Sequence, residues 1–466
     1  MTDRFAGPDG FAGARVLVCG AGLAGLTASR ALLELGAEVL VCADTPAPEL
    51  PSGARFLGSL GQLPDGVAVL ITSPGLRPSH PLLRQAATAG LPVFGELEFA
   101  WRISPAPRPA WLLVTGTNGK TTTVRMLESI LLAAGRRALA VGNVGVPIIS
   151  AVTARPGYQV LAVEASSFQL HYSQSLAPRA GALLNLAEDH LDWHGSMPAY
   201  VREKTKVWAG ESAIGNADDP LVAQLLAQAP AGHRIGFTGG APAPGQYGVS
   251  DGQLVDGAGN TLLPAAEVRP AGAHNLANAL AAAALAGTVG VGPSEIASGL
   301  RAFVPDPHRN QHLATVAGVR YVDDSKATNP HAAAASLGSY RRVIWIAGGQ
   351  LKGADVEPLV AEYGDRLAGA VLLGVDREQI RSALARHAPH LPVIVVSRTD
   401  DGAMQDAVAA ATSLAGADDV VLLAPAAASK DMFVSYQARG LAFAAAVDSL
   451  PRSATDSLPR SATEPA

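Results

Sequence analysis

Short apolar runs that end at glycine or at polar clusters recur along this chain, and helical patterns follow several of them. Residues 111–114 (WLLV) form one such run, which breaks at Gly116. The pattern that follows places apolar residues on one helical face, namely Val124, Leu127, Ile130, Leu131 and Ala134. It predicts a buried strand, a glycine-bearing turn and a helix. Repeated units of this kind are typical of α/β domains with largely parallel sheets.

A second unit with the same layout lies near the N-terminus. Residues 15–44 read as a strand, the spacing Gly20-x-Gly22-x-x-Gly25, an amphipathic helix, a second strand and then Asp44. This layout is typical of a dinucleotide-binding βαβ unit, in which the acid accepts a ribose hydroxyl. Such a turn would hold the pyrophosphate of any nucleotide, so the pattern predicts a Rossmann-like fold and leaves the ligand open.

The order of these runs predicts several α/β domains in one chain. The stretch at 104–110 has three prolines in seven residues and reads as a linker, and strands begin again near residue 305. The sequence DSLPRSAT occurs twice near the end, which is typical of a disordered segment. We expect a Rossmann-like N-terminal domain at 1–106, a central P-loop ATPase domain with a mainly parallel sheet at 107–304, a Rossmann-like C-terminal domain at 305–447 and a disordered tail at 448–466.

Composition narrows the class of protein. The chain has 466 residues, of which 48% are hydrophobic and 16% charged, and its net charge of −5 includes no basic block for nucleic acid. Its two cysteines, Cys19 and Cys42, lie in apolar runs and read as core residues in a reducing compartment. The N-terminus lacks the form of a signal peptide, and the most apolar window, 277–292, is too short to span a bilayer. We expect a soluble cytoplasmic monomer that acts on small molecules, without nucleic-acid or membrane partners.

The turn TGTNGKTT (115–122) has the chemistry of a phosphate cradle. Its backbone N–H groups and the start of the helix attract an anion. Lys120 would reach the outer phosphates, and the hydroxyl of Thr121 would ligate magnesium. Only the second half of the eight-residue phosphate-loop pattern is matched, because Val114 stands where the pattern has glycine. We interpret the turn as a nucleotide site rather than a chance Gly-Lys-Thr.

Polar residues follow two further strands of the central region. The run at 159–164 places Glu164 at its carboxyl end, where open parallel sheets bind ligands, so Glu164 and Thr121 can face one metal ion. The next strand leads into a loop that would read alone as a solvated acidic loop. Beside a phosphate loop, a histidine and a carboxylate favour a metal ligand and its supporting partner. The loop contains Asp189, His190, Asp192 and His194.

Two predicted helices of the central region carry polar residues whose role the hydrophobic pattern does not decide. Lys204 and Lys206 lie on a helix at 198–208, where lysines are usually solvated. An alanine-rich helix at 271–287 carries Asn275 and Asn278 on the face opposite its apolar residues.

A series of motifs between residue 15 and about residue 445 resembles those of the Mur ligases, the amide ligases that build the bacterial peptidoglycan stem peptide. TGTNGKTT is shared across these ligases and with folylpolyglutamate synthetases. EASSFQL and DSKATN are similar to motifs of the D-glutamate-adding ligases. The motifs that follow the phosphate loop are EASSFQL (164–170), HNLANAL (274–280), PHR (307–309), DSKATN (324–329), GGQLKGAD (348–355) and PAAASKDMFVSYQARG (425–440).

The resemblance implies a reaction. ATP would phosphorylate the carboxylate of a UDP-muramoyl-L-alanine, the amine of D-glutamate would attack the acyl phosphate, and ADP and phosphate would leave. An acyl phosphate carries concentrated negative charge, so catalysis would rest mainly on positioning and on electrostatic stabilisation by metal and lysine. The cofactors implied are ATP, Mg²⁺ at two sites and a carbamylated Lys204.

The resemblance also implies roles for individual residues, taken by position in the motifs. The phosphates of ATP and the first magnesium would be held by Gly116, Thr117, Asn118, Gly119, Lys120, Thr121 and Thr122, with Glu164 on the metal. The second magnesium would be held by His190 and the carbamate of Lys204. ATP would also contact Asn275, Arg309 and Asp324 at the seam between the central and C-terminal domains.

The remaining roles concern the two other substrates. D-Glutamate and the transferred phosphate would contact Lys326, Thr328, Lys352, Ser429 and Tyr436. The UDP substrate would contact Leu23, Asp44, Thr45, Ser73, Asn143 and His190, of which Thr45 lies where relatives vary most. The catalytic residues in this set would be Lys120, His190, Lys204, Lys326 and Lys352.

Three alternatives remain beside this interpretation. A nicotinamide dehydrogenase would account for the glycine turn and Asp44, but it gives no role to the phosphate loop or to Glu164. Another amide ligase, such as the L-alanine-adding or the folate enzyme, fits the phosphate loop. The Rossmann-like start argues against the folate enzyme, and SSFQL with DSKATN argue against the others. A nucleotide-dependent switch without chemistry is disfavoured because every candidate lysine and metal ligand is present.

Overall fold

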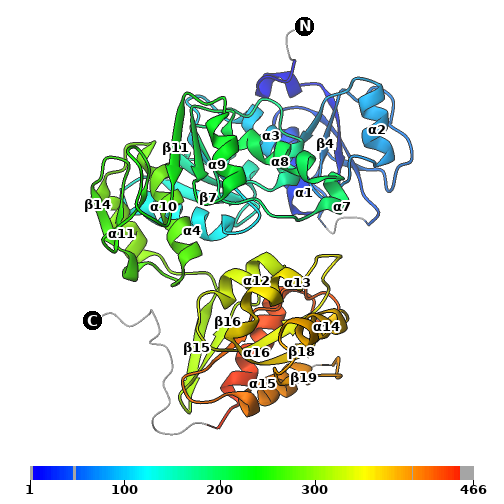
Figure 1. Ribbon diagram of the computed structural model, residues 1–466. Coiled ribbons are helices and arrows are strands. Elements are labelled where there is room, and N and C mark those ends of the chain that lie inside the picture. Colours follow the sequence, from blue (N-terminus) through cyan, green and yellow to red (C-terminus); the bar gives the residue numbers. More distant parts are fainter. Residues whose placement is uncertain (1–3, 46–48, 401, 452–466) are drawn as a thin grey trace. The chain divides into compact units, whose positions relative to one another are not determined.

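The structure is a computed structural model that describes residues 4–45, 49–400 and 402–451 (Figure 1). The chain divides into two compact units. The first runs to Val268 and includes Leu276–Phe303, and the second consists of Arg269–Asn275 and the chain from Val304 onward. Three separate sheets, each wholly or mainly parallel, carry the fold. They confirm the predicted α/β class, in which one Rossmann-like sheet precedes the P-loop sheet along the chain and another follows it. The three domain boundaries stay predictions.

The N-terminal sheet of the first unit is parallel, with the strand order β3-β2-β1-β4-β5. From the central strand β1 the chain first adds β2 and β3 on one side and then β4 and β5 on the other, so the order reverses beside β1. Ligands of open α/β sheets bind at such a point. The strands are β1 (Arg15–Cys19), β2 (Glu38–Cys42), β3 (Arg55–Phe56), β4 (Val69–Thr72) and β5 (Val93–Gly95). The helices are η1 (Pro8–Phe11), α1 (Leu23–Glu34), α2 (Pro81–Thr88) and α3 (Glu96–Ile103).

The central sheet, also in the first unit, is parallel and has the order β11-β10-β9-β6-β8-β7. The order reverses beside β6, which leads into the phosphate loop, while β8 and β9 pair with β6 on either side. The strands are β6 (Ala110–Thr115), β7 (Ala138–Gly142), β8 (Val160–Glu164), β9 (Ala180–Leu183), β10 (Ser212–Asn216) and β11 (His233–Phe237). The three predicted polar segments therefore leave the sheet at one edge, because they follow adjacent parallel strands.

The first helix of the central region, α4, packs on β6, β7 and β8 of this sheet, and α11 packs on α4. The helical elements of this region are α4 (Lys120–Ala133), α5 (Ile148–Thr153), α6 (Ser167–His171), α7 (Leu191–His194), α8 (Met197–Thr205), η2 (Lys206–Trp208), α9 (Pro220–Ala227), η3 (Ala265–Glu267), α10 (Ala273–Gly287) and α11 (Pro293–Ala302). A small antiparallel sheet consists of β12 (Gly248–Ser250), β13 (Gln253–Val255) and β14 (Thr261–Pro264). Residues 279–286 of α10 are fully buried, as expected for a helix that is apolar on all sides.

Buried polar contacts hold the N-terminal sheet against the central region. The carboxylate of Glu98, on α3, is 0% exposed and accepts bonds from the backbone N–H groups of Gln174 (2.8 Å) and Ser175 (3.1 Å). The same carboxylate pairs with Arg102 at 2.6 Å. A buried charge with this many donors is well satisfied. The hydroxyl of Tyr172 also donates to the carbonyl of Leu76 at 3.0 Å. These contacts explain why two sheets form one compact unit.

The second unit contains a six-stranded sheet with the order β15-β16-β20-β17-β18-β19, in which only the β15–β16 pair is antiparallel. Its strands are β15 (Gln311–Val316), β16 (Val319–Asp323), β17 (Val343–Gly348), β18 (Leu367–Leu373), β19 (Val393–Val395) and β20 (Val420–Leu423). Its helical elements are α12 (Pro330–Leu337), α13 (Glu357–Tyr363), η4 (Gly364–Arg366), α14 (Arg377–His387), α15 (Ala403–Leu414) and α16 (Tyr436–Asp448).

Two expectations concern segments rather than sites. Helix α16 ends at Asp448, so the predicted tail begins at the last residue of a helix, and its residues 452–466 lie outside the described residues. Within the described part of the chain, no helix is both long and apolar enough to cross a membrane.

Candidate functional site

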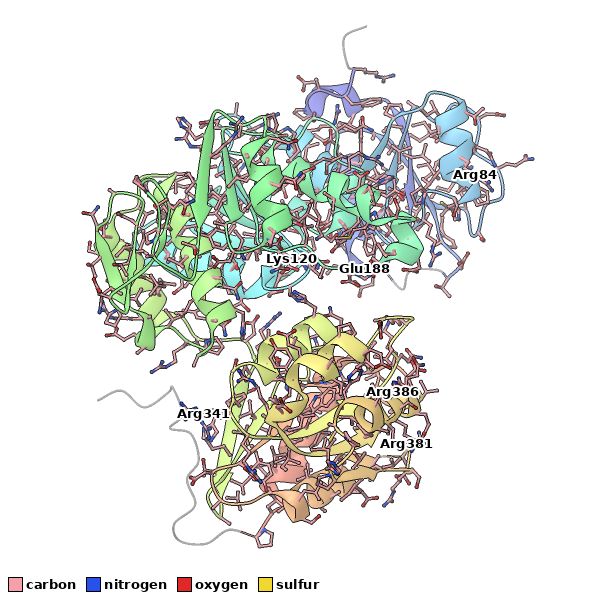
Figure 2. All side chains as sticks on the ribbon, in the orientation of Figure 1. Arg84, Lys120, Glu188, Arg341, Arg381 and Arg386 are labelled. Atoms are coloured by element: carbon pink, nitrogen blue, oxygen red, sulfur yellow. The ribbon has the colours of Figure 1, made fainter. Side chains whose placement is uncertain are left out.

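The phosphate loop folds around its own lysine. The ammonium group of Lys120 donates to the carbonyls of Gly116 (2.9 Å) and Thr117 (2.7 Å), so a cation already lies inside the loop. Gly119 has a φ of +84°, and a Cβ there would lie 2.4 Å from the side-chain oxygen of Asn278. Glycine is therefore required at this position for both its conformation and the space. Lys120 begins α4, as Figure 2 shows.

The sides of the loop are fixed by side chains that follow β9. The side-chain amide of Asn185 accepts from the backbone N–H of Asn118 (2.8 Å) and donates to its carbonyl (3.1 Å). The hydroxyl of Thr117 donates to the carbonyl of Ala187 at 3.1 Å and lies 3.0 Å from the hydroxyl of Tyr200. The loop is thus held in shape by its neighbours, and the sequence motif alone did not identify these neighbours.

The two ligands predicted for the first magnesium lie together. The hydroxyl of Thr121 donates to Glu164 at 2.7 Å, and the amide of Asn143 donates to the other carboxylate oxygen at 2.8 Å. Glu164 is only 2% exposed. Magnesium prefers oxygen ligands and is usually held by one or two carboxylates together with substrate phosphates, so this set of donors fits it. Asn143, predicted to contact the UDP substrate, is linked to the same carboxylate.

Lys204 is buried beside the phosphate loop. Its side chain is 2% exposed, and its ammonium group donates to the carbonyl of Gly116 at 2.7 Å and to the hydroxyl of Thr115 at 3.3 Å. Burial and then the charge of Lys120 lower the pKa of Lys204 well below its ordinary value, against the opposite effect of Asp189 and Glu164. The expectation that Lys204 is solvated, which its helix pattern favoured, is therefore wrong. The lowered pKa increases the tendency of the amine to be neutral.

Lys206 is not a solvated helix residue either. Its ammonium group donates to the carbonyls of Leu170 (2.9 Å), His171 (3.1 Å) and Ser173 (3.3 Å), at the C-terminal end of α6. It also pairs with Glu203 at 2.6 Å. A cation at a helix C-terminus satisfies carbonyls that have no partner within the helix. The helix pattern missed this contact because its partners are backbone atoms of a distant segment.

His190 lies over the aromatic ring of Phe168. The two ring centroids are 4.8 Å apart, and the Nε2 atom of His190 is 3.6 Å from the carboxylate of Asp189. Burial lowers the pKa of His190 although Asp189 acts against it, which favours the neutral imidazole that a metal ion requires. The carboxylate of Asp192 pairs instead with Arg77 at 2.7 Å, although its charge also acts to raise the pKa of His190. The structure therefore brings Asp189 to His190 but not Asp192.

Among the described residues, no group of three or more His, Cys, Asp or Glu side chains is arranged to hold a metal ion. The predicted ligands would not form such a group, because they comprise a hydroxyl, one carboxylate, one imidazole and a lysine.

The glycine turn after β1 is closely packed and presents one apolar residue. A Cβ on Gly25 would lie 2.0 Å from the carbonyl oxygen of Gly20, and a Cβ on Gly20 would lie 2.5 Å from the hydroxyl of Ser73. Leu23 begins α1 and is 66% exposed. Asp44 accepts from the hydroxyl of Ser59 at 2.8 Å. Ser73 and Leu23 thus lie at the turn, while Thr45 is exposed beyond the end of β2.

In the second unit, Lys326 and Tyr436 come together. The ammonium group of Lys326 lies 4.2 Å from the centre of the Tyr436 ring, and the hydroxyl of Ser325 donates to the carbonyl of Tyr436 at 2.8 Å. Thr328 is half-buried, and its backbone N–H donates to the carbonyl of Lys326 at 2.8 Å. Three of the five residues predicted for D-glutamate therefore lie in one place.

The other two lie in neighbouring loops. Lys352 is exposed and has a φ of +55°, whereas Ser429 is buried and its carbonyl accepts from the backbone N–H groups of Met432 and Phe433. Arg439, which the sequence analysis did not single out, is 1% exposed and donates to the carbonyls of Ser325 (2.9 Å) and Ala427 (3.1 Å). It joins the DSKATN segment to the loop that carries Ser429. The signal that could have identified it is a single arginine on an otherwise apolar helix.

The three residues predicted to contact ATP besides the phosphate loop, Asn275, Arg309 and Asp324, also have defined surroundings. Burial raises the pKa of Asp324 to about 6, and the bonds from Ser336 and Asn310 oppose this. The Nε atom of Arg309 lies 3.7 Å from a carboxylate oxygen of Asp306. Asn275 is buried at the start of α10, where its side-chain amide lies 3.0 Å from His274. All three predicted residues belong to the second unit, whereas the phosphate loop belongs to the first.

Two family models match this chain. The Mur ligase middle domain matches residues 114–286, and the glutamate ligase domain of the Mur ligases matches residues 308–427. A UDP-N-acetylmuramoylalanine–D-glutamate ligase from Thermobifida fusca is 52% identical in an alignment 460 positions long that covers 94% of this chain and 99% of the relative. An enzyme of the same name from Streptomyces coelicolor is 50% identical in an alignment 471 positions long that covers 95% of this chain and 99% of the relative.

Solved structures of more distant proteins share the fold. The UDP-N-acetylmuramate–alanine ligase of Thermotoga maritima aligns with a TM-score of 0.58 at 16% identity and covers 93% of this chain and 99% of its own. A pseudomurein peptide ligase from Methanothermus fervidus aligns with a TM-score of 0.58 at 18% identity and covers 88% of this chain and 96% of its own. At these identities the likeness concerns the fold alone. The near-complete match to curated relatives goes further, and the chain belongs to the Mur ligase family.

Proposed function

We propose that this protein is the cytoplasmic ligase that adds D-glutamate to UDP-N-acetylmuramoyl-L-alanine with cleavage of ATP to ADP and phosphate. The observation that carries the proposal is the 52% identity, over 94% of the chain, to a relative with that activity in its name. Because the match extends through both compact units, it includes the phosphate loop as well as the Lys326–Tyr436 pair.

The phosphate loop would bind ATP through its backbone N–H groups and Lys120. Once phosphates enter, the Lys120 ammonium can exchange its bonds to Gly116 and Thr117 for bonds to phosphate oxygens without a large movement. Thr121 and Glu164 would hold magnesium, which when bound offsets the charge that develops on the transferred phosphoryl group. Asn275, Arg309 and Asp324 are proposed as further ATP contacts.

Lys204 would act as a metal ligand after carbamylation, as a finer part of the proposal. Its neutral amine would add to carbon dioxide, forming a nitrogen–carbon bond and losing a proton. The product is an anion with oxygen ligands, which suits magnesium better than an ammonium group does. The burial of Lys204, its lowered pKa and its position against the carbonyl of Gly116 support this step. His190, with a lowered pKa, would complete the second magnesium site.

The glycine turn after β1 would hold the uridine nucleotide, with Leu23, Asp44, Thr45 and Ser73 around it and with Asn143 and His190 towards the muramoyl part. The exposed Leu23 at the start of α1 supports this assignment, because an apolar side chain at a helix N-terminus can pack against a base while the backbone binds phosphate. D-Glutamate would bind to Lys326, Thr328, Lys352, Ser429 and Tyr436.

Phosphate release tests the proposal. Purified protein with ATP and magnesium should release phosphate only when both UDP-N-acetylmuramoyl-L-alanine and D-glutamate are present, and little with L-glutamate. Phosphate release that depends on L-alanine and UDP-N-acetylmuramate, or on no amino acid, would contradict the assignment. For the dehydrogenase alternative, UDP should raise the melting temperature in a concentration-dependent way while NADH should not.

A further inference from the structure

The loop that carries Lys352 is bound along one side to the loop that carries Ser429. The backbone N–H of Gly348 donates to the carbonyl of Pro425 at 2.9 Å. Gln350 and Ala428 then exchange two backbone hydrogen bonds, of 2.8 and 2.9 Å. These bonds set the start of the loop but none of them reaches Lys352 itself.

Asp376 holds the same loop from the other side. Asp376 lies in the turn between β18 and α14, and its carboxylate accepts from the backbone N–H of Leu351 at 2.8 Å. Its own backbone N–H donates to the carbonyl of Gly349 at 3.1 Å. The second carboxylate oxygen accepts from the side-chain amide of Gln379 at 3.1 Å. One residue thus binds the loop on both sides of Gln350 and is itself held by the following helix.

The bond to Leu351 matters because of the conformation of the next residue. Lys352 has a φ of +55°, a left-handed conformation that is unfavourable for a residue with a side chain. Such a conformation persists only where the surroundings determine it. The carbonyl of Leu351 accepts from the backbone N–H of Ala354 at 3.0 Å, which closes the turn around Lys352. Both polar backbone atoms of Leu351 are therefore bonded, one of them to Asp376.

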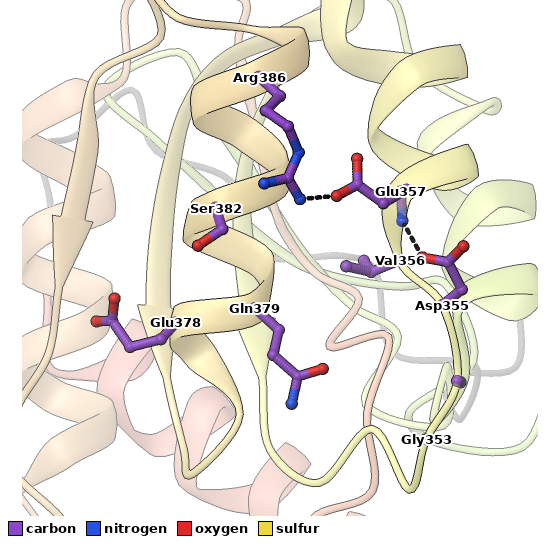
Figure 3. Close-up of a pocket in the computed structure, with 9 residues that line it drawn as sticks. Gly353, Asp355, Val356, Glu357, Glu378, Gln379, Ser382 and Arg386 are labelled. Atoms are coloured by element: carbon purple, nitrogen blue, oxygen red, sulfur yellow. Dashed lines mark hydrogen bonds and ion pairs between the residues drawn. The ribbon is translucent and has the colours of Figure 1, made fainter.

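The far side of the loop is open. A cavity of about 500 Å³ lies between the segment after Lys352 and helix α14, and Figure 3 shows Gly353 and Asp355 across from Gln379. Arg386 of α14 pairs with Glu357 of α13 at the other end of this cavity. Because side chains do not fill this space, packing from that direction cannot fix the loop. The turn at Lys352 is therefore held by the buried side chain of Leu351, which is 4% exposed, and by the Asp376 bonds.

We propose that Asp376 is a positioning residue for the D-glutamate half of the reaction, which it serves by fixing the backbone turn that presents Lys352. The inference rests on the proposed role of Lys352 and deepens it. Asp376 touches neither substrate nor the reacting atoms in this account. Its removal should leave the binding of ATP and of the UDP substrate intact, since the phosphate loop and the glycine turn belong to the other compact unit. The side chain of Asp376 bonds to Leu351 and Gln379 and to none of the further residues proposed for ATP.

The test compares Asp376→Ala with Asp376→Asn and with Glu378→Ala. Asn retains one acceptor for the N–H of Leu351, so it should restore most of the function. Glu378 is a matched control because it is an exposed acid two residues further along, at the start of α14, where it pairs with Arg381 at 2.6 Å. A lost hydrogen bond to a charged group corresponds to a change of about ten- to a hundredfold. We expect the KM for D-glutamate to rise by about tenfold or more in Asp376→Ala. The KM for ATP should be unchanged, and Asp376→Asn and Glu378→Ala should resemble the wild type.

Two further measurements separate this inference from the proposed function. In a Lys352→Ala background, Asp376→Ala should add little, because residues that act through one another are not additive. Backbone amide exchange in 348–354 should be faster in Asp376→Ala than in Glu378→Ala, whatever the substrate is. A wild type without D-glutamate-dependent turnover would contradict the proposed function, and unchanged amide exchange would then overturn the inference as well. A wild-type KM for D-glutamate in Asp376→Ala, or the same rise in Glu378→Ala, would overturn the inference alone.

Discussion

The first compact unit contains two strand–turn–helix segments that share one backbone plan and differ in their side chains. After β1, the turn is shaped by Gly20 and Gly25, and the only large side chain at the start of the helix is the exposed Leu23. After β6, the turn encloses the ammonium group of Lys120, and the Thr121–Glu164 pair and the buried Lys204 lie beside it. The first segment can bind a nucleotide by shape and backbone donors. The second adds the charges that phosphoryl transfer requires.

The comparison predicts that substitutions in the second segment remove turnover, whereas substitutions in the first weaken substrate binding. The largest effect is expected at Lys204. Lys204→Arg keeps a positive charge but cannot form a carbamate, so its turnover should fall by about a thousandfold or more, the scale of losing a main electrostatic group. Lys204→Ala should fall as far, and acetate should restore part of its turnover by replacing the missing carboxylate. Steady-state phosphate release measures both, and wild-type turnover in Lys204→Arg would rule out the carbamate.

Gly25→Ala tests the first segment. The new Cβ would lie 2.0 Å from the carbonyl oxygen of Gly20, so the backbone of the turn must move, at a cost of about 1–3 kcal/mol in the free energy of unfolding. The melting temperature should fall and the shift produced by UDP should shrink, while the shift produced by ATP and magnesium should remain. Gly22→Ala is the matched control for the melting temperature without ligand, because no atom lies within 4 Å of a Cβ at that position. Equal loss of UDP and ATP binding in Gly25→Ala would show that the two turns are not separate sites.

Lys206→Met tests whether Lys206, two residues after Lys204, serves stability rather than turnover. It should remove the three bonds to carbonyls at the end of α6 and the pair with Glu203, and lower the free energy of unfolding by about 1–3 kcal/mol. Lys206→Arg should recover part of this loss. Urea denaturation measures the stability, and turnover per folded molecule should fall much less than in Lys204→Arg. Stability equal to wild type would show that Lys206 is only a solvated lysine.

The smallest expected effect is on the stability of the protein at acidic pH, through Glu203. Burial raises the pKa of Glu203, but the bonds from His171 and Lys206 lower it by more than burial raises it. The resulting pKa is about 2, against an ordinary value of 4.5. A carboxylate whose pKa is lowered on folding stabilises the protein above its ordinary pKa, and this stability is lost as the pH falls towards the folded value. The stability of the wild type should therefore decrease more between pH 4.5 and pH 2 than that of Glu203→Gln. Parallel pH profiles from urea denaturation would contradict this.

The sequence predicted the parts of this molecule that depend on local pattern. The two strand–turn–helix segments follow from apolar runs, glycines and helical periodicity, and the joint position of Thr121 and Glu164 follows from the rule that adjacent parallel strands end at one edge. Contacts between distant segments could not be predicted in this way. Lys206 binds backbone carbonyls, and Arg439 joins the segments that contain Ser325 and Ala427. Glu98 accepts bonds from the segment between α6 and β9. The segments that provide the partners of Lys206, Arg439 and Glu98 have no sequence feature that distinguishes them from ordinary solvated or apolar segments.

The fate of one oxygen atom tests the central claim most directly. If ATP phosphorylates the carboxylate of UDP-N-acetylmuramoyl-L-alanine, a carboxylate oxygen bonds to the γ-phosphorus and leaves with phosphate when the amine of D-glutamate attacks the carbonyl carbon. With substrate labelled by ¹⁸O in that carboxylate, mass spectrometry should find one labelled oxygen in each phosphate released, and only when D-glutamate is present. Unlabelled phosphate under the same conditions would contradict the account.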